Sequence, residues 1–409
     1  MKRYGRVSAF LAGLLGLLTA GQVVADGFRN PPDTAAAIGQ AGKCVAWVDD
    51  ASAVFFNPAN LVDLAARQAL VSVTIGNGGA IYRGQAGKTD TDLPWFGLPA
   101  NAIAWPLPDE RLAVGLGVHV PFGRSSAWDR DGLFHYTAPV YARMMVLDIT
   151  PALAWRVSDE VSVGAGLDIY YGRLHFREFL PPFFGDVAKA AADGWAFGAN
   201  AGVTWRLAPG QRLALTCRAP FDLKFSGTLH IDNAQPPYVV PDSSLSTTFQ
   251  FPMIVTLAYG VQVTDSLRLE TDVEWLQYSR FGAMRVNGGA NAFLLQAAGQ
   301  ANQPTEWNDT FTFGLGASWH FAPAWTLRAG CEYLQSPEPD RTFSPTILDN
   351  NQSLVCLGIG YKRGPHAVDL GIAHGIFGHR NVRGNQNPAY VGEYEFSAEV
   401  AALTYTFDF

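Results

Sequence analysis

Ser318 and His320 have the residue types of a nucleophile and its base, the pair that a lipid hydrolase would need. Residues two apart on a strand share a face but are poorly placed for the hydrogen bond that activates the nucleophile. Nothing else in the sequence forms a triad, and the glycine pairs occupy strand positions rather than phosphate-binding loops. We therefore expect that the protein is not an enzyme. The alternative is a lipid hydrolase.

Four cations share one predicted strand face, where they could pair with the carboxylate of a ligand. They are Arg218, Lys224, Arg268 and Arg328. The alternative is an ion network with the acids on that face, Glu270, Asp272, Glu332 and Asp369.

The four cysteines offer no metal site, because they have neither a CxxC motif nor the spacing of metal ligands. They are Cys44, Cys217, Cys331 and Cys356. The last two lie in neighbouring predicted strands but on opposite faces, so we expect no disulfide between them. We expect no metal and no cofactor.

Apolar residues at every second position mark the elements that must carry these side chains. In SLRLETDVEWLQY, residues 266–278, one face is apolar and the other is ionic. Similar segments predict about fourteen strands, an even number typical of a closed outer-membrane barrel. They span 68–83, 98–107, 111–122, 141–156, 160–176, 194–207, 212–226, 245–263, 266–282, 307–321, 325–337, 350–362, 365–375 and 396–409.

The connections between these segments alternate strictly between short and long. The short turns are LPDER, VSDEV, LAPGQR, TDS, FAPAW and KRGPH, and the long loops lie near 84–97, 123–140, 177–193, 227–244, 283–306, 338–349 and 376–395. In an up-and-down barrel, short turns lie on one side of the membrane and long loops on the other. Strands with an apolar outer face must close in lipid, because every backbone polar group needs a partner. We expect an all-β, transmembrane, antiparallel β-barrel over 67–409, with both termini on the periplasmic, short-turn side.

The composition and the first residues agree with an exported membrane protein. The 409 residues include 42 glycines and 11 tryptophans but only 16% charged residues, which excludes disorder and argues against nucleic-acid binding. Residues 1–25 have a basic start, a short apolar run and a small-residue cleavage site, and so predict a signal peptide. A membrane anchor is the alternative, but it needs about 20 apolar residues.

The chain ends in VAALTYTFDF, whose alternate residues are apolar or aromatic, with Phe409 last. These residues are typical of an aromatic girdle at the membrane interface. The ending also resembles the C-terminal signature that the outer-membrane barrel-insertion machinery recognises.

Residues 26–66 do not alternate and predict a partly helical plug inside the barrel. Asn57 is a capping residue, Pro58 can occupy the first helical position and Ala59 follows it. Asp49 and Asp50 can accept backbone N–H bonds at a turn or a helix start. A barrel of about fourteen strands has a lumen wide enough for such a segment. The alternative is a disordered periplasmic tail.

DDASAVFFNPANL, residues 49–61, resembles the N-terminal hatch of the FadL/TodX family of outer-membrane transporters for hydrophobic compounds. The resemblance continues through GLGVHVPFGRSSAWDRDGLFHYTAPVY and ITPALAWRVSDEVSVGAGLDIYYG and covers the mature chain. It implies a fourteen-stranded barrel, a hydrophobic capture groove on the loops, and lateral release of substrate into the membrane beside a kink in the third strand. Pro121, Phe122 and Gly123 match that kink.

One long loop carries a run of six apolar residues: Phe179, Leu180, Pro181, Pro182, Phe183 and Phe184. Such a run is anomalous unless it is covered or used, so it predicts either a capture groove or a loop that packs on its neighbours. Prolines at 121, 151, 220 and 252 lack ladder donors and predict bends or bulges.

Together these features predict a transporter that takes up long-chain fatty acids. An aromatic hydrocarbon channel and a general porin are the alternatives. The expected partners are the hydrophobic solute, outer-membrane lipid with lipopolysaccharide, and the insertion machinery; we expect a monomer.

Overall fold

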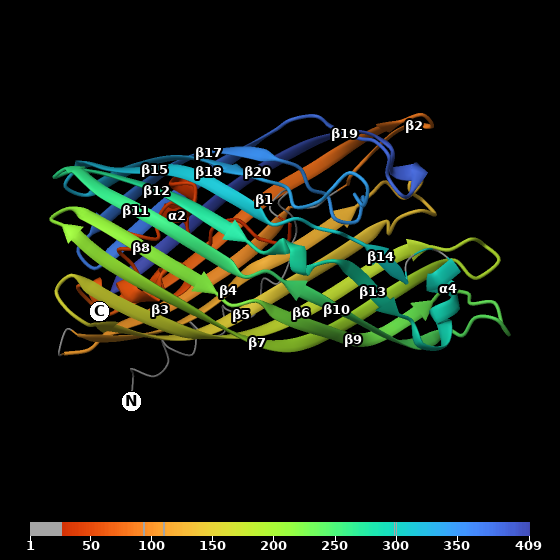
Figure 1. Ribbon diagram of the computed structural model, residues 1–409, viewed down its shortest axis with the longest axis horizontal. Coiled ribbons are helices and arrows are strands. Elements are labelled where there is room, and N and C mark those ends of the chain that lie inside the picture. Colours follow the sequence, from red (N-terminus) through yellow and green to blue (C-terminus); the bar gives the residue numbers. More distant parts are fainter. Residues whose placement is uncertain (1–26, 93–94, 109–110, 298, 300) are drawn as a thin grey trace.

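The chain forms a closed antiparallel β-barrel around its own N-terminal segment (Figure 1). The computed structural model describes residues 27–92, 95–108, 111–297, 299 and 301–409. The expected signal peptide, 1–25, lies outside the described residues. The barrel wall has 14 strand positions, the number that the sequence predicts.

Most wall positions hold one strand: β1 (Gln68–Gly84), β3 (Phe96–Pro106), β4 (Leu112–Ala127), β5 (Tyr141–Arg156), β6 (Val161–Phe179), β7 (Val187–Ala208), β12 (Leu267–Leu276), β15 (Thr310–Ala322), β16 (Trp325–Leu334), β17 (Gln352–Arg363), β18 (His366–Phe377) and β20 (Gly392–Asp408). Two positions are divided, into β8 (Gln211–Arg218) and β9 (Phe221–Ile231), and into β10 (Asp242–Phe251) and β11 (Ile254–Thr264).

Shorter elements complete the chain. The short strands are β2 (Gly87–Asp90), β13 (Ala283–Asn287), β14 (Asn302–Pro304) and β19 (Arg380–Val382). The N-terminal segment contains α2 (Ala35–Gly39), α3 (Ala53–Phe56) and the 3₁₀ helix η2 (Pro58–Asp63). The loops contain η3 (Tyr278–Arg280), η4 (Gly289–Asn291), α4 (Ala292–Ala297) and η5 (Pro388–Tyr390).

The first and last strands close the ring. β1 pairs with β20 from Gln68, opposite Asp408, to Arg83, opposite Glu393, and pairs with β3 on its other edge. The short turns gather at the end where the chain terminates, and the long loops, with α4, lie at the opposite end (Figure 1). We call these the short-turn end and the long-loop end.

The outer face of the wall is apolar, as the alternation predicts. Alternate residues of β15 are exposed and aromatic or aliphatic: Phe311, Phe313, Leu315, Trp319 and Phe321. The residues between them face the lumen and are small or polar, for example Thr312 and Gly314. Among the described helices, none has the length and apolar character to cross a membrane.

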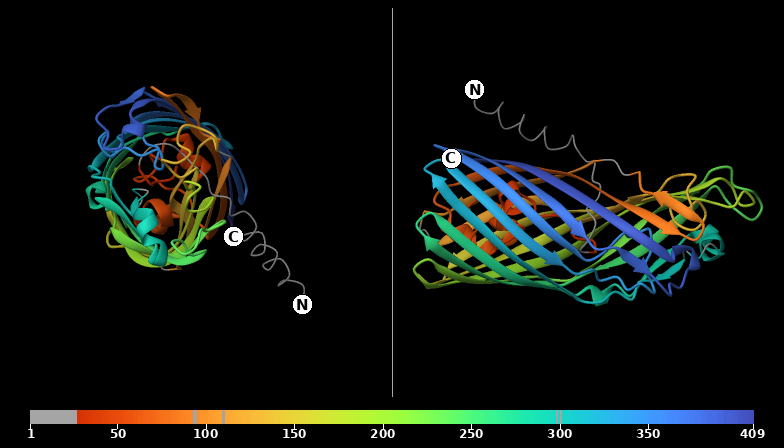
Figure 2. Two further views of the ribbon diagram at one scale, coloured as in Figure 1. Left: turned by 90° about the vertical axis from the view of Figure 1, so that its right-hand side faces the viewer. Right: turned by 90° about the horizontal axis from the view of Figure 1, so that it is seen from above.

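The N-terminal segment fills the lumen, and we call residues 27–66 the plug. Figure 2 shows this red-to-orange segment inside the ring. Glycines of the wall provide the room that it needs: a Cβ added at Gly164 would overlap the backbone of Pro58, and one at Gly371 would overlap that of Ala35. The glycines that face the lumen therefore allow the plug to approach the wall closely.

The prediction of a long loop at 177–193 is wrong for most of these residues. β6 continues to Phe179 and β7 begins at Val187, so the connection covers only residues 180–186. Small alanines, among them Ala190 and Ala192, occupy the buried positions of β7. Alanine gives a weak alternation signal, which is why the sequence did not reveal this part of the strand.

The prolines at 220 and 252 break strands that the sequence predicted as continuous. Because residues lie outside the ladder at these breaks, the inward parity changes from even in β8 to odd in β9, where Phe221, Leu223 and Phe225 are buried. The lumen placement of Lys224 was therefore wrong, since Lys224 is exposed on the outer face.

Candidate functional site

The plug is fixed to the wall near the short-turn end by the motif that the sequence singled out. Asn57 caps η2, as predicted, by accepting the N–H of Ala59 at 3.1 Å. Its Nδ2 donates to the carbonyl of Val45 at 2.9 Å and to Thr204 Oγ1 on β7 at 2.9 Å. Thr204 in turn donates to Asn60 Oδ1 at 2.7 Å. The motif thus joins two turns of the plug to one strand of the wall.

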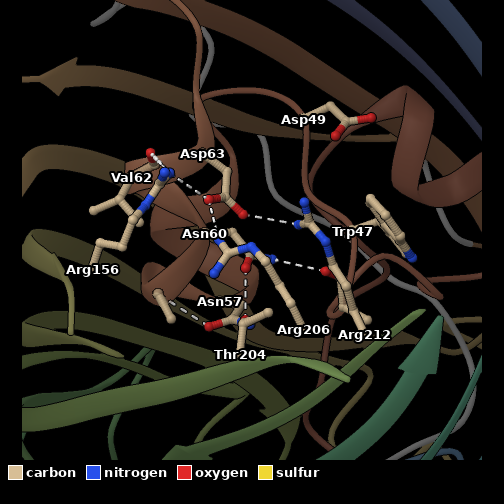
Figure 3. A network of polar contacts seen from close by, with 12 residues as sticks. Trp47, Asp49, Asn57, Asn60, Val62, Asp63, Arg156, Thr204, Arg206 and Arg212 are labelled. Carbon is tan, nitrogen blue, oxygen red and sulfur yellow. Dashed lines mark hydrogen bonds and ion pairs between the residues drawn. The ribbon is translucent and has the colours of Figure 1, made fainter. Parts of the chain in front are cut away.

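Asp63, at the end of η2, binds three arginines from three different strands (Figure 3). Arg156 Nη2 lies 3.0 Å from Oδ1 and Arg212 Nη1 lies 2.9 Å from Oδ2, while Arg206 also pairs with Oδ1. Trp47 packs under the guanidinium of Arg212, 3.8 Å from the ring centroid. We call residues 45–63 the base of the plug.

Buried charges hold Lys43 and the first residues of the base. Lys43 Nζ lies 2.7 Å from Asp272 and 2.6 Å from Glu332. Glu270 accepts the backbone N–H groups of Val45, Ala46 and Trp47, at 2.5, 2.8 and 3.1 Å. Three of the four acids that the sequence offered as an ion network, Glu270, Asp272 and Glu332, therefore bind the plug itself.

The two aspartates at the start of the quoted motif have separate roles. Asp50 accepts the N–H of Ser52 at 2.8 Å and so shapes the turn before α3, as predicted. Asp49 pairs with Arg268 of the wall.

The remaining predicted cations on the lumen face are also paired with acids. Arg218 Nη1 lies 2.7 Å from Asp148 and 3.3 Å from Asp168, and Arg328 Nη1 lies 2.6 Å from Asp369. Together with the pair between Arg268 and Asp49, these contacts form an ion network, which was the alternative to pairing with the carboxylate of a ligand.

β4 bends at the predicted proline. Its ladder with β5 shifts register between His119 and Phe122, on either side of Pro121. Before the bulge the even-numbered residues Val114 and Leu116 are exposed on the outer face. After it, Phe122 and Arg124 are buried, so the bulge turns the even positions toward the lumen. The alternation of apolar residues in the sequence did not place Arg124 in the lumen. Pro121 marks the bulge and is the feature from which this placement could have been predicted.

The bend opens the wall between β3 and β4. Their ladder extends only from Asn101 opposite Val118 to Pro106 opposite Ala113. In the described residues, the next pairing is a single bridge between Thr91 and Trp128 at the long-loop end. We call the unpaired stretch between these limits the window. Four buried apolar side chains belong to one cluster beside it: Phe96, Leu98, Val120 and Met145.

The first residues of the plug cover the bend, and we call residues 27–33 the arm. The N–H of Asn30 donates to the carbonyl of Pro121 at 2.9 Å, and that of Gly123 donates to the carbonyl of Phe28 at 2.8 Å. Phe28 is fully buried and packs on Phe249, Phe251, Phe281 and Trp307, with ring centroids 5.6, 5.7, 4.8 and 4.8 Å away. The arm thus pairs with backbone groups that the window leaves without a neighbouring strand.

His119 connects the arm to the wall just before the bend. Its Nδ1 lies 2.9 Å from Asp33 of the arm and its Nε2 lies 3.2 Å from Asp148 of β5. The imidazole stacks on Phe55 of the plug at 4.3 Å.

Two cavities meet the arm from opposite sides. One, of about 150 Å³, lies between the plug and the wall and reaches Pro121 and Phe122. The other, of about 70 Å³, lies toward the long-loop end. Its lining surface is mostly apolar and includes Phe28, Met144 and Phe249. Three charged residues also line it: Arg124, Arg143 and Glu178. We call the second the apolar cavity.

The six residues of the predicted capture groove do not share one face. Leu180 is buried in the main apolar cluster and Phe184 packs against that cluster. Phe183 is 70% exposed. Phe179 and Pro182 line an open depression of about 840 Å³, and Pro181 is exposed. The loop therefore packs on its neighbours through two residues and leaves the others at the surface.

In the described part of the chain, His320 and one candidate metal-ligand group each contact other side chains. Nδ1 of His320 shares a hydrogen bond with Thr326 Oγ1 at 2.9 Å. His379, Glu393 and Glu395 are the group of possible metal ligands in the described residues, but Glu395 pairs with Arg83 at 2.5 Å. Cys331 is exposed on the outer face and Cys356 is buried, on opposite faces as their parity predicts.

Known proteins share this architecture. The family model for outer membrane protein transport proteins (OMPP1/FadL/TodX) matches residues 16–409. The long-chain fatty acid transport protein of Escherichia coli K12 is 21% identical, over 89% of each chain.

Two solved structures share the fold. A Pseudomonas aeruginosa FadL homologue has a TM-score of 0.81 at 22% identity and covers 94% of this chain and 100% of its own. The Pseudomonas putida toluene transporter TodX has a TM-score of 0.73 at 16% identity and covers 95% of this chain and 99% of its own. The chain belongs to the OMPP1/FadL/TodX family and is an outer-membrane transport protein for hydrophobic compounds.

Proposed function

We propose that the protein takes up long-chain fatty acids, which bind in the apolar cavity and leave sideways through the window into the membrane. The observation that carries this proposal is an apolar cavity that contains one buried arginine, Arg124, and lies next to an unpaired stretch of the wall. A fatty acid has the matching chemistry, since its chain is apolar and its carboxylate pairs with a guanidinium.

Two loop acids interact with Arg124 from outside the apolar cavity. The charges of Glu338 and Asp349, both in the loop between β16 and β17, interact with Arg124. Burial raises the pKa of each carboxyl group above its ordinary value. A higher pKa favours the neutral form of these acids, in which their attraction for the guanidinium is weaker.

The path that we propose runs from the long-loop end to the window. Phe179, Pro181, Pro182 and Phe183 are proposed as the capture surface, with Phe183 as its most exposed residue. Leu180 and Phe184 would anchor that loop on the apolar cluster. The arm must then move, because Phe28 lines the apolar cavity and pairs with the bend at Pro121, Phe122 and Gly123. The base stays in place, so the solute does not cross to the short-turn end.

The same proposal fixes the orientation. The long-loop end faces the exterior and both termini face the periplasm, after removal of residues 1–25 as a signal peptide. Phe409 is half exposed at the short-turn end, where it is available to the insertion machinery. We propose a monomer in which residues 26–66 and 67–409 form the plug and the barrel.

An aromatic hydrocarbon is the second candidate substrate. The rings that surround Phe28 would accept another aromatic ring once the arm has moved. Such a ligand has no carboxylate and would make no use of Arg124.

Ligand binding to Arg124→Gln separates these substrates. Loss of a hydrogen bond between charged groups costs about 1.5–3 kcal/mol, so we expect a long-chain fatty acid to bind about 10- to 100-fold more weakly. Toluene binding should be unchanged. Arg341→Gln is the matched control, because Arg341 is an exposed arginine of the same end of the barrel. Equal fatty acid affinity for Arg124→Gln and the control would contradict the carboxylate assignment.

A further inference from the structure

Basic side chains cluster on the outer face of β5, β6 and β7 at the long-loop end. They are Arg143, Arg173, His175, Arg177 and Lys189, and we call them the basic patch. The ladders place them side by side: Arg143 is opposite His175, and Arg177 is opposite Lys189. Arg143 borders the apolar cavity, and the other four residues lie outside it.

On β6 the patch continues the row of side chains that faces lipid. Leu167 is exposed on that row, followed at alternate positions by Ile169 and Tyr171, and then by Arg173. The residues between the arginines, Leu174 and Phe176, pack against the apolar cluster inside the barrel. The same strand face therefore changes from aliphatic to aromatic to basic as it leaves the membrane.

The aromatic residues fix the depth of the patch. Tyr171 is opposite Trp195 in the ladder, and their ring centroids lie 4.7 Å apart, which is typical of the girdle at a membrane interface. A strand tilted by about 45° gains roughly 2.3 Å of height per residue. Arg173 then lies about 5 Å and Arg177 about 14 Å beyond the girdle. Each headgroup region is about 5–8 Å thick, so Arg173 lies within it and Arg177 lies at or beyond its outer edge.

Three arginines of the patch have no acidic partner among the described residues. No ion pair is formed there by Arg143, Arg173 or Arg177, although Asp193 is opposite Arg173 in the ladder. Arg173 and Arg177 lie instead over the rings of Tyr171 and Tyr141, at 5.9 and 5.8 Å. Lys189 differs, since it pairs with Asp232 at 2.5 Å. The three guanidinium groups are thus available to an external anion.

We propose that the basic patch binds the phosphorylated headgroup of lipid A, the glycolipid of the outer leaflet. Guanidinium groups bind phosphate through two parallel hydrogen bonds, and the acyl chains of the same lipid would cover the apolar residues below the girdle. A free phosphate ion could pair with the arginines but would not cover the apolar residues below the girdle. The inference rests on the proposed orientation, because lipid A lies on the exterior side.

The patch also lies next to the window. Arg143 is opposite Ser125 of β4, in the part of that strand beyond the bend. A lipid bound at the patch would therefore border the wall where the solute leaves it.

Native mass spectrometry of the detergent-solubilised protein, titrated with lipid A, tests the assignment. The test variant is Arg173→Gln/Arg177→Gln, which leaves the apolar cavity untouched. The control is Arg363→Gln/Arg383→Gln, two exposed arginines away from the patch. We expect the test variant to bind lipid A at least about tenfold more weakly than the unmodified protein, and the control to change by less than about twofold.

Three further measurements complete the test. Lipid A stripped of its phosphates should bind the unmodified protein and the test variant equally. An unchanged heat-dependent shift in gel mobility shows that the test variant is folded. Unchanged fatty acid binding by the test variant separates this inference from the proposed transport. Equal lipid A binding by test variant and control, or displacement of lipid A by millimolar inorganic phosphate, would overturn the assignment.

Discussion

The base and the arm of the plug contact the wall in different ways, although fewer than 40 residues of one segment contain both. The base is held by side chains from several strands: Thr204 binds its asparagines, and three arginines converge on Asp63. The arm pairs with one bent strand through backbone bonds at Pro121 and Gly123 and inserts the ring of Phe28. It also pairs with β12 through Arg29 and Glu274. The arm makes fewer side-chain bonds to the wall than the base does, so we propose that the arm is the moving part.

The largest effect is expected at the base. Asp63→Ala removes the acid that compensates Arg156, Arg206 and Arg212. Loss of one member of a partly buried ion network costs about 3–5 kcal/mol, so the free energy of opening of the base should fall by about this amount. Hydrogen exchange at the amides of residues 45–63 measures it. Asp49→Ala, at an exposed ion pair, is the control, and an equal loss of protection in both variants would argue against a special role for Asp63.

The next effect concerns the arm. Phe28→Ala leaves a cavity among the aromatic rings around it. Truncation of a buried phenylalanine costs about 3–5 kcal/mol in a rigid core. The arm is less rigid than a core, so the free energy of detaching it should fall by about 3 kcal/mol or less. Hydrogen exchange of Asn30 and Gly123, whose N–H groups join the arm to the bend, should become fast. The amide of Asn60 in the base should keep its protection. If both regions lost protection together, the plug would be one unit and the comparison would fail.

A smaller effect is expected at the cap of η2. Asn57→Ala removes the acceptor for Ala59 and the donor to Val45 and Thr204. The loss of a cap and of buried hydrogen bonds costs about 1–2 kcal/mol, measured as faster exchange in residues 58–63. Asn350→Ala, in a loop at the opposite end, should leave this exchange unchanged. A change confined to the arm would contradict the assignment of Asn57 to the base.

The smallest effect is expected at Asn30. Asn30→Ala removes the bond from its Nδ2 to the carbonyl of Val120 at 2.7 Å but keeps the backbone pairing. One such bond contributes about 1 kcal/mol, so exchange at Gly123 should rise by about five- to tenfold. An effect as large as that of Phe28→Ala would mean that the side chain of Asn30, rather than the ring, holds the arm.

The wall could be predicted from the sequence wherever strands alternate without interruption. β5 was predicted at the residues where it occurs, 141–156, because its outer face is apolar and its connections are short on one side and long on the other. The cap at Asn57 was also predictable, since its residues are adjacent in the chain.

Breaks in the ladder set the limit of this reasoning. The bulge at Pro121 turns Arg124 into the barrel, and the break at Pro220 turns Lys224 out of it. A proline predicts that a bend occurs but does not say how many residues leave the ladder, so the faces beyond it cannot be assigned. Long-range partners are equally hidden: the arginines that meet at Asp63 come from three strands, and no local pattern connects them.

Disulfide locks in a cysteine-free variant test the central claim most directly. Arg29→Cys/Phe122→Cys joins the arm to the bend at residues that form a β-bridge, and Asn57→Cys/Gly202→Cys joins the base to β7 at a close approach. We predict that oxidation of the first pair abolishes fatty acid uptake by cells and that reduction restores it, whereas the second lock leaves uptake unchanged. Full uptake with the arm locked, or loss of uptake only with the base locked, would contradict lateral release controlled by the arm.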